Sequence, residues 1–161
     1  MDALRFLASA LGHAKQPSSG LNALARTLQD RFGYRLFTVL VLDAGRDHVR
    51  RHFSSLPDDY PPGGTKPMRK DSEFFRTVVE QGLPRLCSNR EECLRAFPDH
   101  ELIFSLGCES AVNVPVRWNG TTIGSLNLLH RAGWYSDAML PELSWYSALA
   151  VPIVQQAIAT P

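Results

Sequence analysis

Residues 107–130 constrain the fold more than any other part of the chain, because they have the pattern of one β-hairpin. Two arms rich in apolar residues meet at Asn119-Gly120, the dipeptide that most readily adopts the positive φ angles of a two-residue type I′ turn. Such a turn fixes the register of both arms. Counting outward from it predicts that Asn113 faces the opposite side of the sheet from Ser125 and Asn127. Both predicted faces are largely apolar, which indicates a central hairpin covered on both sides.

Before the hairpin, the spacing of apolar residues changes from helical to nearly continuous. Residues 1–12 carry leucines at helical spacing and predict a short amphipathic helix. Residues 21–32 predict a second helix, which ends at Gly33. The runs 35–42 and 48–54 predict two strands. The first third of the chain is therefore expected to contain helices followed by strands.

The middle of the chain is less regular. Residues 55–70 hold four of the eleven prolines and show no periodicity, and they predict a long loop that is either a binding segment or a plain connector. Residues 71–81 have the pattern of a capped helix, and residues 83–87 that of a brief strand. Ser88-Asn89-Arg90-Glu91 has the form of a capping box at the start of a helix. Asp99 is predicted to cap a further short helix before the hairpin.

A final helical region follows the hairpin. Ser136-Asp137 is predicted to begin it, and Pro152 is predicted to kink or interrupt it. Its apolar stripe consists of Leu140, Leu143, Tyr146, Leu149, Ala150, Ile153 and Ala157. The region is therefore expected to bury one face against the rest of the fold.

The order of residues in the hairpin resembles the C-terminal half of a GAF domain. The resemblance is carried by Asn113-Val114-Pro115-Val116, by Asn119-Gly120, by residues 123–128 and by the closing capped helix, and it is strongest over residues 107–158. It implies a single GAF/PAS-like domain over residues 1–161 and indicates no subfamily. The implied fold is α+β, with a central antiparallel sheet, terminal helices on one face, and loops and short helices around a pocket on the other.

Composition excludes some classes of function. The 17 Lys and Arg residues nearly balance the 16 Asp and Glu residues, and a net charge of +1 gives no long-range attraction to nucleic acid or to an anionic membrane. No apolar run approaches the roughly 20 residues that span a bilayer, and the N-terminus lacks the layout of a signal peptide. A cytoplasmic protein is expected. Three cysteines, an odd number, favour reduced thiols over a disulfide framework.

Polar residues on the hairpin are the first candidates for a binding site. A buried amide is costly unless it is hydrogen-bonded, so these residues either tie loops to the sheet, the interpretation we favour, or orient a ligand in a mostly apolar cavity. Aromatic residues, including Phe74 and Trp118, would supply the walls or belong to the core. The candidate ligand-binding residues are Phe53, Tyr60, Phe75, Phe104, Cys108, Ser110, Asn113, Ser125 and Asn127.

The cysteines suggest a second kind of chemistry. One GAF branch, the free methionine-(R)-sulfoxide reductases, uses a nucleophilic cysteine before the hairpin strand, where Cys108 lies, and Cys87 or Cys93 would then resolve the intermediate. The sequence around Cys108 departs from that branch's motif, which favours an inert buried thiol. Irregular spacing from these cysteines to His100 argues against a metal site. The signatures of bilin-binding and cyclic-nucleotide-binding GAF domains are missing, so no cofactor is indicated.

The favoured function is therefore a non-enzymatic sensor. A small organic ligand of unknown identity would enter between residues 55–70 and the sheet, and the terminal helices, as the resemblance implies, would form a homodimer that signals to a separate partner. A thiol-dependent reductase is the first alternative. A dimerisation module without a ligand is the second, and it predicts that side chains fill the space beneath the hairpin.

Overall fold

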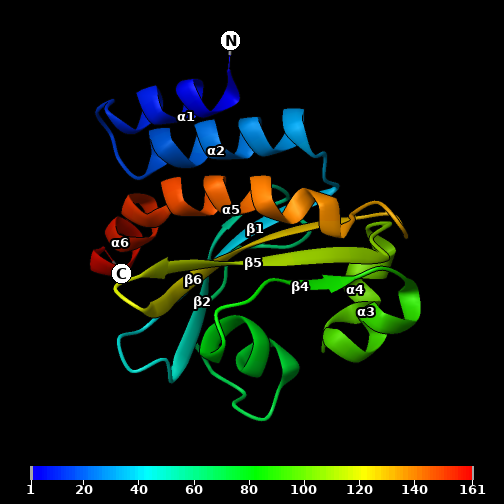
Figure 1. Cartoon of the computed structure of the whole chain (residues 1–161). Coiled ribbons are helices and arrows are strands. Elements are labelled where there is room, and N and C mark those ends of the chain that lie inside the picture. The colour runs from blue at the N-terminus through cyan, green and yellow to red at the C-terminus, as the bar shows by residue number, and fades with distance from the viewer. Residues whose placement is uncertain (1, 161) are drawn as a thin grey trace.

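A computed structural model describes residues 2–160 and shows helices and strands arranged around one antiparallel sheet (Figure 1). The strands are β1 (Leu36–Leu42), β2 (His48–Ser54), β3 (Lys66–Pro67), β4 (Arg85–Cys87), β5 (Ser110–Trp118) and β6 (Thr121–His130). Within the described residues the sheet has the order β3-β2-β1-β6-β5-β4, and every neighbouring pair is antiparallel. The predicted hairpin, β5 and β6, lies inside this sheet.

Helices cover both faces of the sheet. They are α1 (Ala3–Leu11), α2 (Ser18–Arg31), the π-helix η1 (Phe75–Glu80), α3 (Arg90–Ala96), α4 (His100–Ser105), the 3₁₀ turn η2 (Asp137–Met139), α5 (Leu140–Leu149) and α6 (Val151–Ala159). The terminal helices α1, α2, α5 and α6 lie on one face, whereas η1, α3 and α4 lie on the other (Figure 1). The predicted α+β class and the division of helices between the faces are confirmed.

The main core lies between the sheet and the terminal helices. Strand residues alternate between the two faces, and the apolar residues of the central strands point toward these helices. They are Phe37, Val39, Val41, Val112, Val114, Val116, Leu126 and Leu128. Each is almost completely buried, and burying one such side chain stabilises the fold by roughly 1.5–3 kcal/mol.

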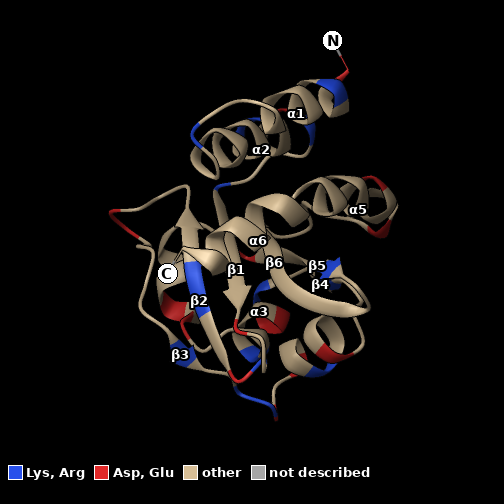
Figure 2. Cartoon of the chain, turned by 90° about the vertical axis from the view of Figure 1, so that its left-hand side faces the viewer, with Lys and Arg blue, Asp and Glu red and all other residues tan. Residues whose placement is uncertain are grey.

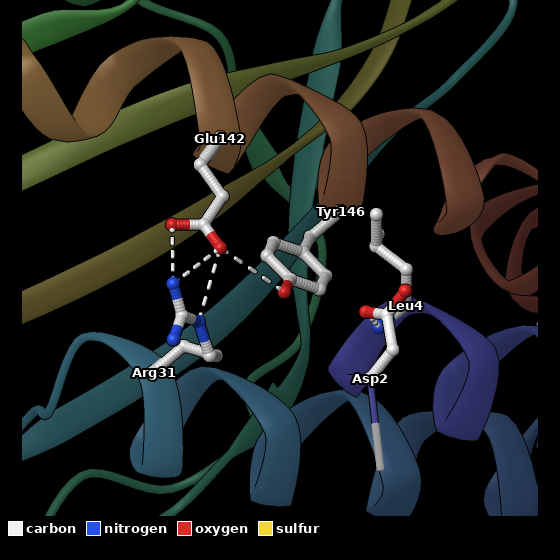
Figure 3. Close-up of polar contacts among 5 residues, drawn as sticks. All are labelled: Asp2, Leu4, Arg31, Glu142 and Tyr146. Atoms are coloured by element: carbon white, nitrogen blue, oxygen red, sulfur yellow. Dashed lines mark hydrogen bonds and ion pairs between the residues drawn. The ribbon is translucent and has the colours of Figure 1, made fainter.

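An ion pair joins two of these helices at their exposed edge (Figure 3). Arg31, at the end of α2, donates from Nε and Nη2 to the carboxylate of Glu142 on α5 at 2.7 to 3.0 Å. The Tyr146 hydroxyl donates to the same carboxylate at 3.5 Å. Nearby, the Asp2 carboxylate accepts the Leu4 N–H at 3.0 Å and caps α1. Solvent-exposed pairs of this kind stabilise a protein little, so packing holds this layer together.

The turn of the hairpin is as predicted, but its register is not. Asn119 and Gly120 have φ angles of 52° and 76°, as a type I′ turn requires. A β-bulge between Val116 and Arg117 then shifts the pairing by one residue, so that Asn113 pairs with Asn127. The predicted separation of these two asparagines onto opposite faces is therefore wrong, because one extra residue in a strand exchanges the faces beyond it.

Several local predictions also need correction. The long loop contains the short edge strand β3, which pairs with the start of β2. The capping box lies one residue later than predicted, because Asn89 accepts the Glu92 N–H at 2.9 Å and the Glu92 carboxylate accepts the Ser88 N–H at 2.6 Å. Asp99 precedes α4 but makes no side-chain capping bond, since its carboxylate accepts the hydroxyl hydrogen of Tyr60.

The ends of the chain follow the predictions more closely. The second helix begins at Ser18, earlier than expected, and the chain leaves it through Gly33 at a φ of 77°. The final helical region divides into α5 and α6 at Ala150, two residues before Pro152. Within residues 2–160, none of the helices has the length and apolar character to span a bilayer.

Candidate functional site

A cavity of about 650 Å³ lies on the sheet face opposite the terminal helices. Its floor is formed by the central strands, and its walls by residues 66–76 and by residues 94–100 around the end of α3. A cavity of this size is typical of sites for small organic ligands. The predicted loop contributes Tyr60 and the stretch from Lys66 to Arg69 to its lining.

A row of polar side chains crosses the cavity floor over four neighbouring strands. Arg85 Nε of β4 donates to Asn113 Oδ1 of β5 at 2.9 Å, and Asn113 Nδ2 donates to Asn127 Oδ1 of β6 at 2.8 Å. Asn127 Nδ2 donates to Thr38 Oγ1 of β1 at 3.2 Å. Each amide accepts on one side and donates on the other, which satisfies buried groups that would otherwise be costly. We call these four residues the polar row.

The register of the sheet produces the polar row. Arg85 pairs with Asn113, Asn113 pairs with Asn127, and Asn127 pairs with Thr38 in directly opposed positions. Directly opposed side chains are close enough to bond. The bulge is required for this alignment, because the extra residue Ile123 in β6 brings Asn127 to the same face as Asn113.

Arg85 is the least expected member of the site. Its side chain is 5% exposed, and its guanidinium carbon lies 5.6 Å from the ring centre of Phe74 and 5.3 Å from that of Phe97. Burial lowers the pKa of the Arg85 guanidinium. Arg85 was not among the site residues predicted from the sequence. The one available signal was its position inside a predicted apolar strand, because an arginine there must either be exposed at the edge of the sheet or be buried with a bonding partner.

The mouth of the cavity is predominantly basic. Among the described residues, the basic side chains of the lining are Arg51, Lys66, Arg69, Arg76, Arg85 and Arg95, and the acidic ones are Asp71 and Glu73. Figure 2 shows basic positions of this group on β2 and β3. Of these side chains only Arg85 is buried, and Arg51 is partly buried. The cavity therefore favours negatively charged molecules.

Tyr60, Arg51 and Asp99 form a second contact cluster at the mouth, the Tyr60 cluster. The Tyr60 hydroxyl donates to the Asp99 carboxylate, and the Arg51 guanidinium carbon lies 3.8 Å from the centre of the tyrosine ring. Arg51 also lies 3.9 Å from Asp99. Burial, followed by the bond to Asp99, raises the pKa of Tyr60. The cluster fastens the loop after β2 to the beginning of α4.

Some candidate residues lie outside the cavity. Phe53 packs against Phe37 on the helix-covered face, with ring centres 5.6 Å apart. Ser110 Oγ donates to the Arg131 carbonyl at 2.6 Å and ties the hairpin to the next loop. Ser125 Oγ donates to Asn127 Oδ1 at 3.1 Å and supports the polar row from its own strand.

The remaining aromatic candidates are also displaced from the lining. Phe104 packs under the Arg90 guanidinium, 4.0 Å from ring centre to guanidinium carbon, and Phe75 is half-buried. Phe74 lines the cavity in place of Phe75. Trp118 is 58% exposed near the hairpin turn. Tyr60, Asn113 and Asn127 are therefore the predicted residues that the fold brings together at the cavity.

The three cysteines are buried in a small core next to the cavity, and none of them lines it. Burial raises the pKa of the Cys108 thiol to about 11, which disfavours the nucleophilic thiolate. The neighbouring Cys93 thiol lowers the pKa of Cys87. Within the described residues, no group of three or more His, Cys, Asp or Glu side chains is arranged to hold a metal ion.

The sheet, the helical layer on one face and the cavity on the other define an α+β domain of the PAS-like class. No protein-family model and no curated protein matches the chain. Solved structures do. The GAF domain from an Acinetobacter phosphoenolpyruvate-protein phosphotransferase is 16% identical with a TM-score of 0.75, over 99% of this chain and 95% of that one.

Two further solved structures are similar to the chain. The GAF domain of a two-component sensor histidine kinase from Bacillus halodurans is 14% identical with a TM-score of 0.72, over 89% of this chain and 96% of that one. The free methionine-R-sulfoxide reductase from Neisseria meningitidis, in complex with its substrate, is 18% identical with a TM-score of 0.64, over 98% of this chain and 88% of that one. The chain has the GAF domain fold. At these identities the likeness establishes the fold and no activity.

Proposed function

We propose that residues 1–161 act as one sensory GAF domain, which binds a small organic molecule in the cavity and signals to a separate partner. The observation that carries this proposal is the polar row on the floor of a cavity of about 650 Å³. Buried polar groups in an otherwise apolar sheet stabilise the core less than apolar side chains would. Their presence here is explained if they bind a ligand. A dimerisation module without a ligand would instead have its own side chains in this space.

A thermal-shift screen tests ligand binding. Anionic, neutral and cationic metabolites are added at saturating concentration to the purified chain. A molecule that binds the native state alone must raise the melting temperature, since 100 times its Kd contributes about 2.7 kcal/mol. Stabilisation by at least one class supports the proposal. If compounds of all three classes leave the melting temperature unchanged, the proposal is wrong.

The proposed sensor works as a homodimer through its terminal helices. Exposed apolar side chains on these helices support this, namely Trp145 of α5 and Ile158 of α6, which are 53% and 36% exposed. Light scattering at micromolar concentration should give the mass of a dimer, and Trp145→Glu should reduce it to that of a monomer. Trp118→Glu is the matched control, because Trp118 is 58% exposed, similar to Trp145, but lies on the sheet. A wild-type monomer would contradict this part of the proposal.

A second candidate function is thiol-dependent reduction of a small sulfoxide. It is favoured by the three neighbouring cysteines and by the likeness to a free methionine-R-sulfoxide reductase. Turnover of free methionine sulfoxide with a thiol reductant, lost in Cys108→Ser, would establish it and displace the non-enzymatic sensor. The position of the thiols outside the cavity lining and the raised pKa of Cys108 favour the sensor.

A further inference from the structure

Two arginines of the molecule differ in how their charge is balanced. Arg31 is exposed, and its guanidinium binds both oxygens of the Glu142 carboxylate (Figure 3). Arg85 is 5% exposed, and within the described residues no carboxylate lies within 4.0 Å of it. A buried cation without a partner is far more costly than an exposed one. Glu73 of the cavity lining acts on Arg85 only from beyond this distance, so the buried Arg85 has no carboxylate bonded to it.

The free part of the Arg85 guanidinium borders the cavity. Its Nε is occupied by Asn113 Oδ1, and its two terminal nitrogens have no acceptor among the described residues. Two terminal N–H groups in one plane match the two oxygens of a carboxylate. The polar row fixes the orientation of this edge, because Asn113 is itself fixed by Asn127.

The charges around the cavity limit the ligand to one buried negative charge. Arg85 is the one buried cation of the lining, and the other basic groups of the mouth are exposed or partly exposed. Arg69 forms an ion pair with Asp71 at 3.6 Å, so the charge of Arg69 is already neutralised. A dianion would bring a second charge into the interior without a buried partner.

Apolar side chains surround the rest of the space. Leu40, Val49 and Leu129 of the sheet and Phe97 after α3 contribute to the lining. The cavity volume of about 650 Å³ far exceeds what a carboxylate alone would fill. An apolar or aromatic body is therefore needed to fill it. The hydroxyl of Thr38, which only accepts within the polar row, is a further polar group on the cavity floor that a ligand can bond.

We infer that the cavity binds a small organic monocarboxylate with an apolar or aromatic body, and that the two terminal nitrogens of Arg85 hold its carboxylate. This rests on the proposed sensory function and names the chemical class of its ligand. Asn113, Asn127 and Thr38 position Arg85, and the apolar lining contacts the body of the ligand.

Matched pairs of acids and amides test this inference on the full chain. Calorimetric titration compares phenylacetate with phenylacetamide, 3-phenylpropionate with 3-phenylpropionamide, and hexanoate with hexanamide. At least one acid should bind, and its amide should bind at least about tenfold more weakly, because the amide lacks the charge that Arg85 requires. An amide that binds as tightly as its acid would overturn the inference.

Variants of the site provide a second measure. Arg85→Gln keeps a donor for Asn113 but removes the charge, and it should weaken binding of the acid at least about tenfold while changing the amide less than about twofold. Arg90→Gln is the matched control, since Arg90 lies outside the lining and should change neither affinity. Unchanged affinity of Arg85→Gln for the acid would overturn the inference.

Asn113→Asp covers the case in which Arg85→Gln does not fold. It places a carboxylate beside Arg85 Nε and should compete with an acid ligand, again weakening its binding at least about tenfold. If neutral or cationic compounds stabilise the protein and no acid does, the inference is wrong and the sensory function stands. If no compound of any class binds, the sensory function is wrong and the inference falls with it.

Discussion

The two faces of the sheet use the same strands for different purposes. Toward the terminal helices, β1 and β6 present Phe37, Val39 and Leu128 to a continuous apolar core. Toward the cavity, the alternate positions Thr38 and Asn127 carry polar groups. A row of valines or leucines could occupy these positions and would stabilise the fold more. The helix-covered face therefore contributes most to the stability of the fold. The polar groups of the cavity face contribute less to stability and are available to bind a ligand.

Adjacent leucines on β6 give the largest expected contrast between the faces. Leu128 is completely buried in the helix-side core, and Leu128→Ala should lower the free energy of unfolding by about 2–5 kcal/mol, because it leaves a new cavity. Leu129 already borders the cavity, so Leu129→Ala should cost at least about 1 kcal/mol less. Urea denaturation of both variants measures the difference. Equal losses would mean that the two faces are packed alike.

The polar row should behave differently from the core. Asn113→Ala leaves Arg85 Nε without its acceptor and removes one of the two donors to Asn127 Oδ1, the other being Ser125 Oγ. It should lower the free energy of unfolding by about 1–3 kcal/mol.

Replacing the whole polar row by apolar residues distinguishes a role in ligand binding from a role in stability. The triple variant Arg85→Met, Asn113→Leu, Asn127→Leu removes the polar groups together, and it should be more stable than Asn113→Ala and at least as stable as the wild type in urea denaturation. It should also lose the ligand-dependent stabilisation that the wild type shows. A triple variant much less stable than Asn113→Ala would show that the row serves the fold and not a ligand.

The parts of the fold that depend on local sequence could be predicted. Asn119-Gly120 specifies its turn by backbone preference, Gly33 ends a helix for the same reason, and Pro152 lies where the last helix divides. Each of these signals acts over a few residues. Their outcome does not depend on what packs against them.

The site depends on features that act over longer distances. The bulge opposite Val116 and Arg117 adds one residue, Ile123, to β6 without any change in the apolar pattern, so the alternation gave the wrong face for Asn113. Arg85 and its partner Asn113 are 28 residues apart in the sequence, and only the pairing of β4 with β5 brings them together. Polar residues on the hairpin could be recognised as unusual from the sequence. Which of them meet in one row is decided by the register of the sheet.

The buried thiols add a pH-dependent contrast on the cavity side. The Cys108 pKa is raised to about 11 by burial, whereas an unfolded cysteine titrates near 9.0. The unfolded state therefore releases its proton first as pH rises, and stability falls between these values, by about 1.4 kcal/mol at pH 10 from this group. Cys108→Ala should lose less stability than the wild type between pH 8 and pH 10 in urea denaturation. An alkaline loss in Cys108→Ala equal to that of the wild type would contradict this role of Cys108.

Two tyrosines provide the smallest and most local contrast between the faces. The Tyr60 hydroxyl binds Asp99 beside the cavity, whereas the Tyr34 hydroxyl donates to the Ala25 carbonyl on the helix-covered side at 2.9 Å. Each change to Phe removes one hydrogen bond and should cost about 0.5–1.5 kcal/mol. Only Tyr60→Phe should speed hydrogen exchange and proteolysis within residues 55–65, because the Tyr60 cluster fastens this loop to α4. If Tyr34→Phe opened the same loop, the two faces would be coupled, and the loop could report ligand binding to the terminal helices directly.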